Sequence, residues 1–141
     1  MILNRQKKIR VAVGPLQAFL ERVQAETREK DAELTVCLVS DAEMARLNQK
    51  FRRKRGPTDV LSFPAKERRK ADSDGARFLG DIAIAPETAR RYALRDGRKL
   101  KDELKILILH GALHLLGYDH ETDHGQMDRI EKKLRRRLGL T

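Results

Sequence analysis

The sequence predicts a single α+β domain in which a small mixed β-sheet of about four strands packs with about five helices. Its 141 residues suit one compact domain with one core. Short apolar runs are interspersed with longer segments of helical periodicity, and no segment repeats. A composition of 40% hydrophobic, 37% charged and 4% aromatic residues indicates a globular protein with an aliphatic core. We therefore treat residues 1–141 as one domain.

The first two strands are expected on either side of a helix. Residues 3–11 predict the first strand, and residues 34–39 predict the second. Between them, Pro15 favours the first turn of a helix. The apolar residues that follow have the spacing of one helix face: Leu16, Phe19, Leu20 and Val23.

A second helix should follow the strand at 34–39. Ser40 or Asp41 can cap its first turn, and its apolar positions lead toward Phe51. The helix delivers the basic run KFRRKR at residues 50–55. The Gly-Pro pair at 56–57 then breaks the chain.

Two further strands are expected on either side of a polar loop. Residues 60–63 form a short apolar strand ended by Pro64, because proline cannot continue a central ladder. Residues 65–75 are rich in charged residues and predict an exposed loop. Residues 78–85 predict the last strand, and the proline that opens residues 86–95 predicts a helix there.

The longest apolar helical pattern spans residues 100–116. Gly117 follows it, at the position where helices commonly end in a left-handed turn. A last helix is expected over residues 123–138, with a basic outer face. Its apolar face carries Met127, Ile130, Leu134 and Leu138.

The formal net charge of +10 points to a polyanionic partner, either RNA, DNA or an anionic membrane, although many proteins are merely basic. Cys37 is the single cysteine and lies in an apolar run, which is typical of a buried small hydrophobe in a reducing cytosol. The longest uncharged stretch, residues 106–118, is too short to span a bilayer, and the first residues lack a signal-peptide pattern. These features favour a cytoplasmic, non-membrane protein.

Three histidines form the most specific pattern in the chain. His110 and His114 lie four residues apart on the predicted helix, so both imidazoles can reach one metal ion. Gly117 can reverse the chain and return His120 as a third ligand, with the ligand spacing of the metzincin zinc proteases. Three imidazoles leave a fourth tetrahedral position open, as in catalytic zinc sites. We therefore predict a zincin-like metal site at the end of a central helix.

One position departs from the protease pattern. The residue after the first histidine, a glutamate that acts as general base in zincins, is Gly111 here. Peptide hydrolysis by that route would therefore lack its proton acceptor. Either another residue supplies the base, with Asp59 and Asp81 as candidates, or the metal-bound hydroxide acts on a substrate that needs less help.

The histidine segment HGALHLLGYDH resembles the signature HGxLHLxGYDH of the bacterial YbeY endoribonucleases, a family associated with ribosomal RNA maturation. Residues 47–64, LNQKFRRKRGPTDVLSFP, look like that family's LNxxyRxxxxPTDVLSFP block. Residues 79–86, LGDIAIAP, look like its LGDIxI strand, and the tail around Met127 and Glu131 is similar too. The blocks follow the family's order and cover over half of the chain.

The resemblance implies three metal ligands, which map onto His110, His114 and His120, and one bound zinc ion per chain. Imidazole ligands also accept nickel or another divalent transition metal. The family's functional arginine maps onto Arg52, so Arg52 and His114 are the expected catalytic residues. His124 stands where an acidic residue is expected and is interpreted as a surface histidine. The remaining expected substrate-binding residues are Arg53, Lys54, Arg55, Thr58, Asp59 and Ser62.

The implied activity is a single-strand-preferring endoribonuclease that acts in maturation of the 16S ribosomal RNA 3′ end and in ribosome quality control. A metal-activated water or RNA 2′-hydroxyl would attack phosphorus while Arg52 clamps the phosphate. The implied partners are ribosomal RNA, the small ribosomal subunit, and ribosomal or GTPase proteins.

Two alternatives remain open at this stage. The ligand spacing also suits a zinc metalloprotease, an interpretation that Gly111 weakens. The strong basic charge and the absence of an obvious general base also suit a non-catalytic RNA-binding ribosome assembly factor with a structural metal.

Overall fold

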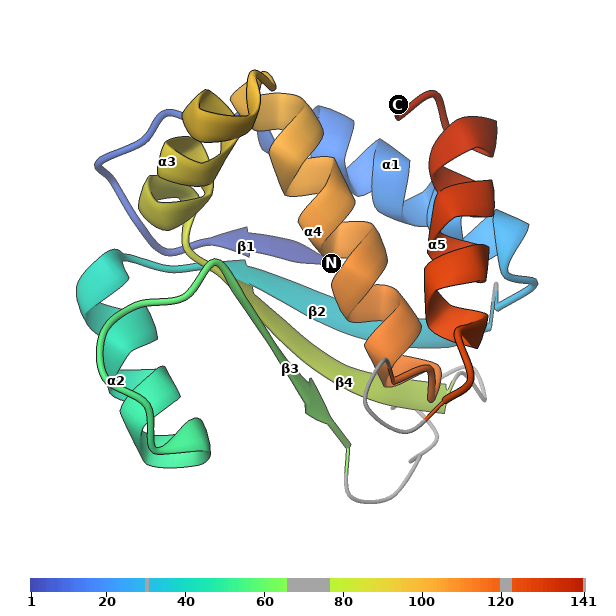
Figure 1. Ribbon diagram of the computed structural model, residues 1–141, viewed down its shortest axis with the longest axis horizontal. Coiled ribbons are helices and arrows are strands. Elements are labelled where there is room, and N and C mark those ends of the chain that lie inside the picture. Colours follow the sequence, from blue (N-terminus) through green and yellow to red (C-terminus); the bar gives the residue numbers. More distant parts are fainter. Residues whose placement is uncertain (30, 66–76, 120–122, 141) are drawn as a thin grey trace.

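The structure is an α+β fold with a four-stranded mixed sheet. A computed structural model describes residues 1–29, 31–65, 77–119 and 123–140 (Figure 1). The strand order is β1-β2-β4-β3, in which β1, β2 and β4 run parallel and β3 runs antiparallel to β4. The strands span Ile2–Asn4 (β1), Ala32–Leu38 (β2), Val60–Pro64 (β3) and Arg77–Ile84 (β4).

Five helices accompany this sheet in the described ranges, as the sequence predicts. They are α1 (Val13–Glu26), α2 (Asp41–Arg52), α3 (Pro86–Asp96), α4 (Leu100–Leu115) and α5 (Gln126–Arg137). Local capping explains where two of them begin. The Ser40 hydroxyl accepts a hydrogen bond from the Glu43 amide at the start of α2, and Pro86 occupies the first turn of α3.

The first strand is much shorter than predicted, since β1 ends at Asn4 rather than near residue 11. The buried side chain of Gln6 causes this difference. Its amide nitrogen donates to the Ile9 carbonyl, and its amide oxygen accepts from the Ile9 amide. The side chain therefore folds the chain into a turn, which replaces the hydrogen bonds of a strand.

Two other predicted boundaries also shift. Helix α1 begins at Val13, two residues before Pro15, so the proline stands inside the first turn. Helix α5 begins at Gln126 instead of residue 123, because the Asp123 carboxylate accepts hydrogen bonds from the amides of Gly125 and Met127. Asp123 thus lies ahead of the helix, whose N-cap residue is Gly125, and its carboxylate binds two amides at the helix start. Most of the loop predicted over residues 65–75 lies outside the described residues.

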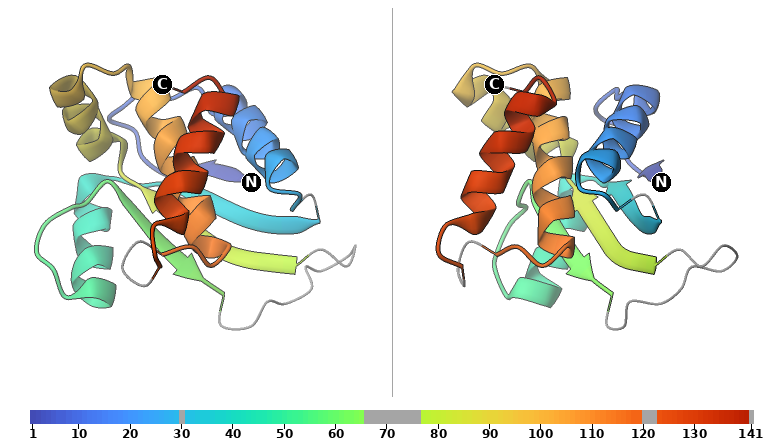
Figure 2. Two further views of the ribbon diagram at one scale, coloured as in Figure 1. Left: turned by 45° about the vertical axis from the view of Figure 1, so that its right-hand side comes forward. Right: turned by 90° about the vertical axis from the view of Figure 1, so that its right-hand side faces the viewer.

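The helices form unequal layers on the two faces of the sheet. Helices α1 and α4 cover one face, with α1 over β1 and β2 and α5 on the opposite flank of α4 (Figure 2). The main core fills this side and includes Val36, Ile82 and Ile84. Helix α2 packs on the other face through a smaller cluster around Met44 and Leu61. In the described part of the chain, no helix is long and apolar enough to cross a membrane.

Helix α4 packs against β4 at Gly111, where there is no room for a side chain. A β-carbon built at Gly111 would stand 2.9 Å from two carbons of the fully buried Ile82 side chain. The residues on either side of Gly111 in the helix, including His110, are positioned by this contact.

A test of this contact is the substitution Gly111→Ala. We expect it to lower the free energy of unfolding by about 1–3 kcal/mol, because Ile82 is enclosed and the added methyl group overpacks the interface. Denaturant unfolding measures the change. Gly14→Ala is the matched control: Gly14 is helical and a β-carbon there would meet nothing within 4 Å. Gly14→Ala should raise the free energy of unfolding by up to about 1 kcal/mol. Equal effects of the two substitutions would contradict the packing argument.

Candidate active site

The last two turns of α4 present two imidazoles that face one another. The Nε2 atoms of His110 and His114 lie 3.1 Å apart, and the ring planes meet at 71° with centroids 4.7 Å apart. Both residues are half-buried. The four-residue spacing predicted from the sequence therefore places both nitrogens around one point.

The chain reverses directly after these histidines, as predicted. Gly117 adopts a left-handed φ of 101°, and its amide donates a hydrogen bond to the His114 carbonyl. The Tyr118 amide donates to the Leu113 carbonyl one turn earlier. Both bonds satisfy carbonyls at the end of the helix. The third predicted ligand, His120, lies outside the described residues.

A carboxylate orients the first histidine. The Nδ1 atom of His110 lies 2.7 Å from Oε1 of Glu131, which comes from α5. When His110 carries its proton on Nδ1, it donates to Glu131 and leaves Nε2 free of hydrogen. The sequence argument did not assign this role to Glu131. A signal was present, since Glu131 is an acidic residue between the buried Met127 and Leu134 on one helix face.

The pair of His110 and His114 fits a metal ion by two criteria. Two imidazole nitrogens bound tetrahedrally to zinc at about 2.0–2.1 Å would stand roughly 3.3–3.4 Å apart, close to the separation between these Nε2 atoms. A histidine that binds a metal through one nitrogen commonly donates to a carboxylate through the other. Among the described residues, no group of three or more His, Cys, Asp or Glu side chains is placed to hold a metal ion, and the predicted third ligand, His120, lies outside them.

Two successive residues of β3 lie between the end of α2, which carries Arg52, and helix α4. Phe51, its neighbour on α2, packs edge-to-face on Phe63 with ring centroids 5.1 Å apart. Ser62 faces the other way, and its hydroxyl donates to the Gly111 carbonyl at 3.4 Å. Edge strand β3 thus separates the end of α2 from α4. Arg52 itself is exposed, and within the described ranges its guanidinium makes no hydrogen bond or ion pair.

The other predicted substrate-binding residues are spread along the approach to β3. Arg53 ends α2 with a left-handed φ of 55°, and Lys54 and Arg55 follow it, all three being exposed. Thr58 and Asp59 are half-buried, with the threonine hydroxyl 3.4 Å from the aspartate carboxylate. Asp59 lies three residues before Ser62, about 10 Å away along a strand. The structure therefore brings Ser62 to α4 but leaves Asp59 nearer the start of β3.

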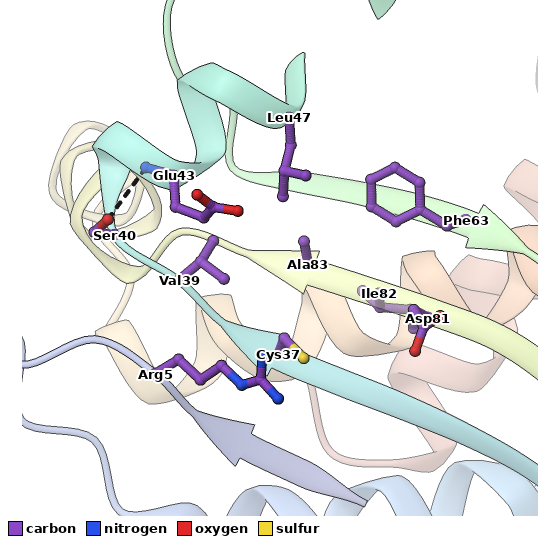
Figure 3. Close-up of a pocket in the computed structure, with 10 residues that line it drawn as sticks. All are labelled: Arg5, Cys37, Val39, Ser40, Glu43, Leu47, Phe63, Asp81, Ile82 and Ala83. Atoms are coloured by element: carbon purple, nitrogen blue, oxygen red, sulfur yellow. Dashed lines mark hydrogen bonds between the residues drawn. The ribbon is translucent and has the colours of Figure 1, made fainter. Parts of the chain in front are cut away.

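Asp81 was the other candidate base, and this expectation is wrong. The register pairs Asp81 with Phe63, so its side chain lies on the sheet face opposite α4. There it lines a pocket of about 290 Å³ with Cys37 (Figure 3). Burial raises the pKa of the Asp81 carboxyl, and burial is also the largest cause of the raised pKa of the Cys37 thiol. The sheet separates both groups from the histidines.

His124 is exposed, as expected of a surface histidine, but it precedes the last helix instead of belonging to it. Its backbone amide donates to the Gln126 side chain.

Comparisons with known proteins give the chain its class. Residues 1–139 match the family described as Endoribonuclease YbeY. The Endoribonuclease YbeY of Koribacter versatilis is 43% identical over 140 residues, which cover 99% of this chain and 86% of that protein. That of Solibacter usitatus is 43% identical over 125 residues, covering 89% and 78%. A solution structure of a Thermotoga maritima protein superposes with a TM-score of 0.67 at 31% identity, covering 98% and 89% of the two chains.

An α+β fold with a paired-histidine helix beside an edge strand is an arrangement suited to a hydrolase. The family match over residues 1–139 narrows this class to hydrolases that cleave RNA. The chain belongs to the YbeY endoribonuclease family, whose members hydrolyse RNA phosphodiester bonds.

The contact between Glu131 and His110 generates a test. Glu131→Gln keeps the size of the side chain but weakens the hydrogen bond that holds His110, so we expect zinc affinity to fall about 10- to 100-fold. Competition with a chromogenic chelator measures the affinity. Asp128→Asn on the same helix is the control, since Asp128 pairs only with Lys132 among the described residues. Equal zinc affinity in the Glu131 variant and the wild type would remove the orienting role.

Proposed function

We propose that this protein is a metal-dependent, single-strand-preferring endoribonuclease that acts in maturation of the 16S ribosomal RNA 3′ end and in ribosome quality control. The observation that carries the proposal is the histidine pair of α4. Its Nε2 atoms lie 3.1 Å apart, and the Glu131 carboxylate contacts Nδ1 of His110. Family membership supplies the reaction class.

The proposed ligands are His110, His114 and His120, and the proposed metal is one zinc ion per chain. Nickel or another divalent transition metal would fit the same imidazoles. When bound, the metal supplies Lewis acidity to an attacking oxygen and to the phosphoryl group. Glu131 holds His110 in the tautomer whose Nε2 can bind.

Arg52 is proposed to hold the scissile phosphate. Its guanidinium is charged at any working pH and can donate two parallel hydrogen bonds to phosphate oxygens. The packing of Phe51 on Phe63 holds the end of α2 against the edge strand β3, which supports a role for the neighbouring Arg52 near the site. Arg53, Lys54 and Arg55 are exposed directly after it and would attract the RNA backbone.

Ser62, Thr58 and Asp59 are proposed as supporting residues along β3. Ser62 is anchored to the carbonyl of Gly111, next to His110. Of the two candidate bases, Asp59 directly precedes β3, whereas the side chain of Asp81 lies on the sheet face opposite α4. The attacking oxygen is either water or the RNA 2′-hydroxyl, and the two give different product ends.

The proposed partners follow from charge and composition. A net charge of +10 favours association with ribosomal RNA in the small subunit, in the cytoplasm. With aromatic residues at 4% of the chain, extensive base stacking is not available. Specificity would then come from the ribosomal particle and from ribosomal or GTPase protein partners.

The central test compares Arg52→Ala, Arg52→Lys and His114→Ala in cleavage of single-stranded and structured RNA, with casein as a protease control. We expect Arg52→Ala to lower kcat/KM at least about 100-fold, as removal of a transition-state donor does elsewhere. Arg52→Lys should recover only part of this loss, because lysine cannot bind two oxygens in a planar fork. Arg22→Ala, which removes an exposed arginine of α1, is the matched control.

Two outcomes of this experiment would redirect the proposal. Cleavage of casein without cleavage of RNA would indicate a metalloprotease. Normal RNA processing by Arg52→Ala, together with unfolding of His114→Ala, would indicate a structural metal in an RNA-binding assembly factor.

A second prediction concerns the metal and the products. Elemental analysis of protein purified without a histidine tag should find one divalent ion per chain, and His114→Ala should lose it. Mass spectrometry of the cleaved RNA identifies the nucleophile, since a 2′,3′-cyclic phosphate would exclude direct attack by water. Full cleavage by metal-free protein would contradict the proposed mechanism.

A further inference from the structure

A second, strongly basic groove lies at the opposite end of α4 from the histidines. Its volume is about 540 Å³, and it is formed by the loop after β1, the end of α3 and the turn into α4. These segments meet beside the start of α4, at the top left of Figure 1. The side chains that line it include Lys8, Arg10, Arg90, Arg98, Lys99 and Leu94.

Two of the five cations are neutralised by neighbouring carboxylates. Arg98 lies 3.0 Å from the buried Glu103 and 3.4 Å from Asp96. The Lys8 ammonium lies 3.6 Å from Glu87. These pairs hold the walls of the groove together.

The other three cations are Arg10, Arg90 and Lys99. All are exposed, and none makes an ion pair within the part of the chain that the structure describes. They come from three different segments and converge on one concave surface. Such an excess of positive charge in a groove attracts a polyanion, because clefts lined by one sign of charge concentrate the opposite charge.

The axis of α4 sets the distance between the groove and the histidines. Leu100 lines the groove, and 10 to 14 residues separate it from His110 and His114. At about 1.5 Å per residue, the groove lies roughly 15–21 Å along the helix from the imidazoles. A stacked strand that rises about 3.4 Å per nucleotide covers that span with roughly five or six nucleotides.

We propose that this groove is a second RNA-binding site, which holds the phosphodiester backbone of a substrate strand several nucleotides from the bond that is cut. The inference rests on the proposed function, in that the strand is the substrate of the histidine site. Guanidinium and ammonium groups bind phosphate oxygens of any sequence, so the groove contributes affinity and direction rather than base readout. Leu94, with 72% of its surface exposed, offers an apolar contact for a ribose or base.

The test measures binding of a 20-nucleotide single-stranded RNA and of a trinucleotide to the full-length, metal-loaded protein. Both probes carry a fluorescent label and a 2′-O-methyl phosphorothioate backbone that resists cleavage. The variant is Arg10→Gln/Arg90→Gln. We expect it to bind the long RNA about tenfold more weakly, with the slope of log affinity against log salt reduced by about 1.4, roughly 0.7 for each lost phosphate contact. Trinucleotide binding should be unchanged.

Two control variants of the same protein complete the experiment. Arg22→Gln/Arg136→Gln removes the same charge from exposed positions on α1 and α5 and should bind the long RNA nearly as wild type does. Arg10→Lys/Arg90→Lys retains the groove's charge and should restore binding, which excludes misfolding as the cause. Equal loss in the groove and control variants, or equal loss for both RNA lengths, would overturn the inference. Because this readout is binding, it is separate from cleavage: a wild-type protein that bound but never cut RNA would contradict only the proposed function.

Discussion

The arrangement of the site depends on the close approach of α4 to β4 at Gly111. Its missing side chain lets the helix backbone settle against Ile82, which is fully buried. The Gly111 carbonyl also accepts the Ser62 hydroxyl, so the same residue joins the helix to the edge strand. The glycine that takes the place of the zincin glutamate therefore has a packing role as well. The contact between Gly111 and Ile82 sets the distance between the sheet and the part of α4 that carries both imidazoles.

Around that contact, groups distant in sequence meet through a short series of interactions. Glu131 reaches His110 from α5, and Phe51 reaches Phe63 from α2. Neither interaction is strong alone, since a hydrogen bond contributes about 1 kcal/mol net and an aromatic pair about 0.5–1.5 kcal/mol. Both interactions matter for geometry. The first restricts the His110 ring, and the second restricts Phe51 at the end of α2. A hydrolytic site requires this kind of restriction to a fraction of an ångström.

Much of the fold could be predicted because its signals are local. The cap at Ser40, the proline of α3 and the left-handed Gly117 depend on a few neighbouring residues, and they lie where the sequence places them. The length of β1 could not be predicted, since the turn made by Gln6 is specific to its side chain. The role of Glu131 depends on how α5 packs beside α4, across 21 residues. Likewise, the face on which Asp81 lies follows from the sheet register, which local periodicity alone did not determine.

The distribution of charge links the fold to its substrate. The chain has 31 Lys and Arg against 21 Asp and Glu residues. Several carboxylates serve structural roles, such as Glu103 beneath the α3–α4 turn and Glu87 beside the N-terminal loop. Each of these lies beside a cation, Arg98 and Lys8 respectively, whereas Arg10, Arg90 and Lys99 make no ion pair in the described part of the chain. Because α4 has these three cations beside its start and the histidines near its end, a rigid helix sets the spacing between them. If the proposed groove binds RNA, a protein with few aromatic residues would in this way recognise a strand by the positions of its phosphates.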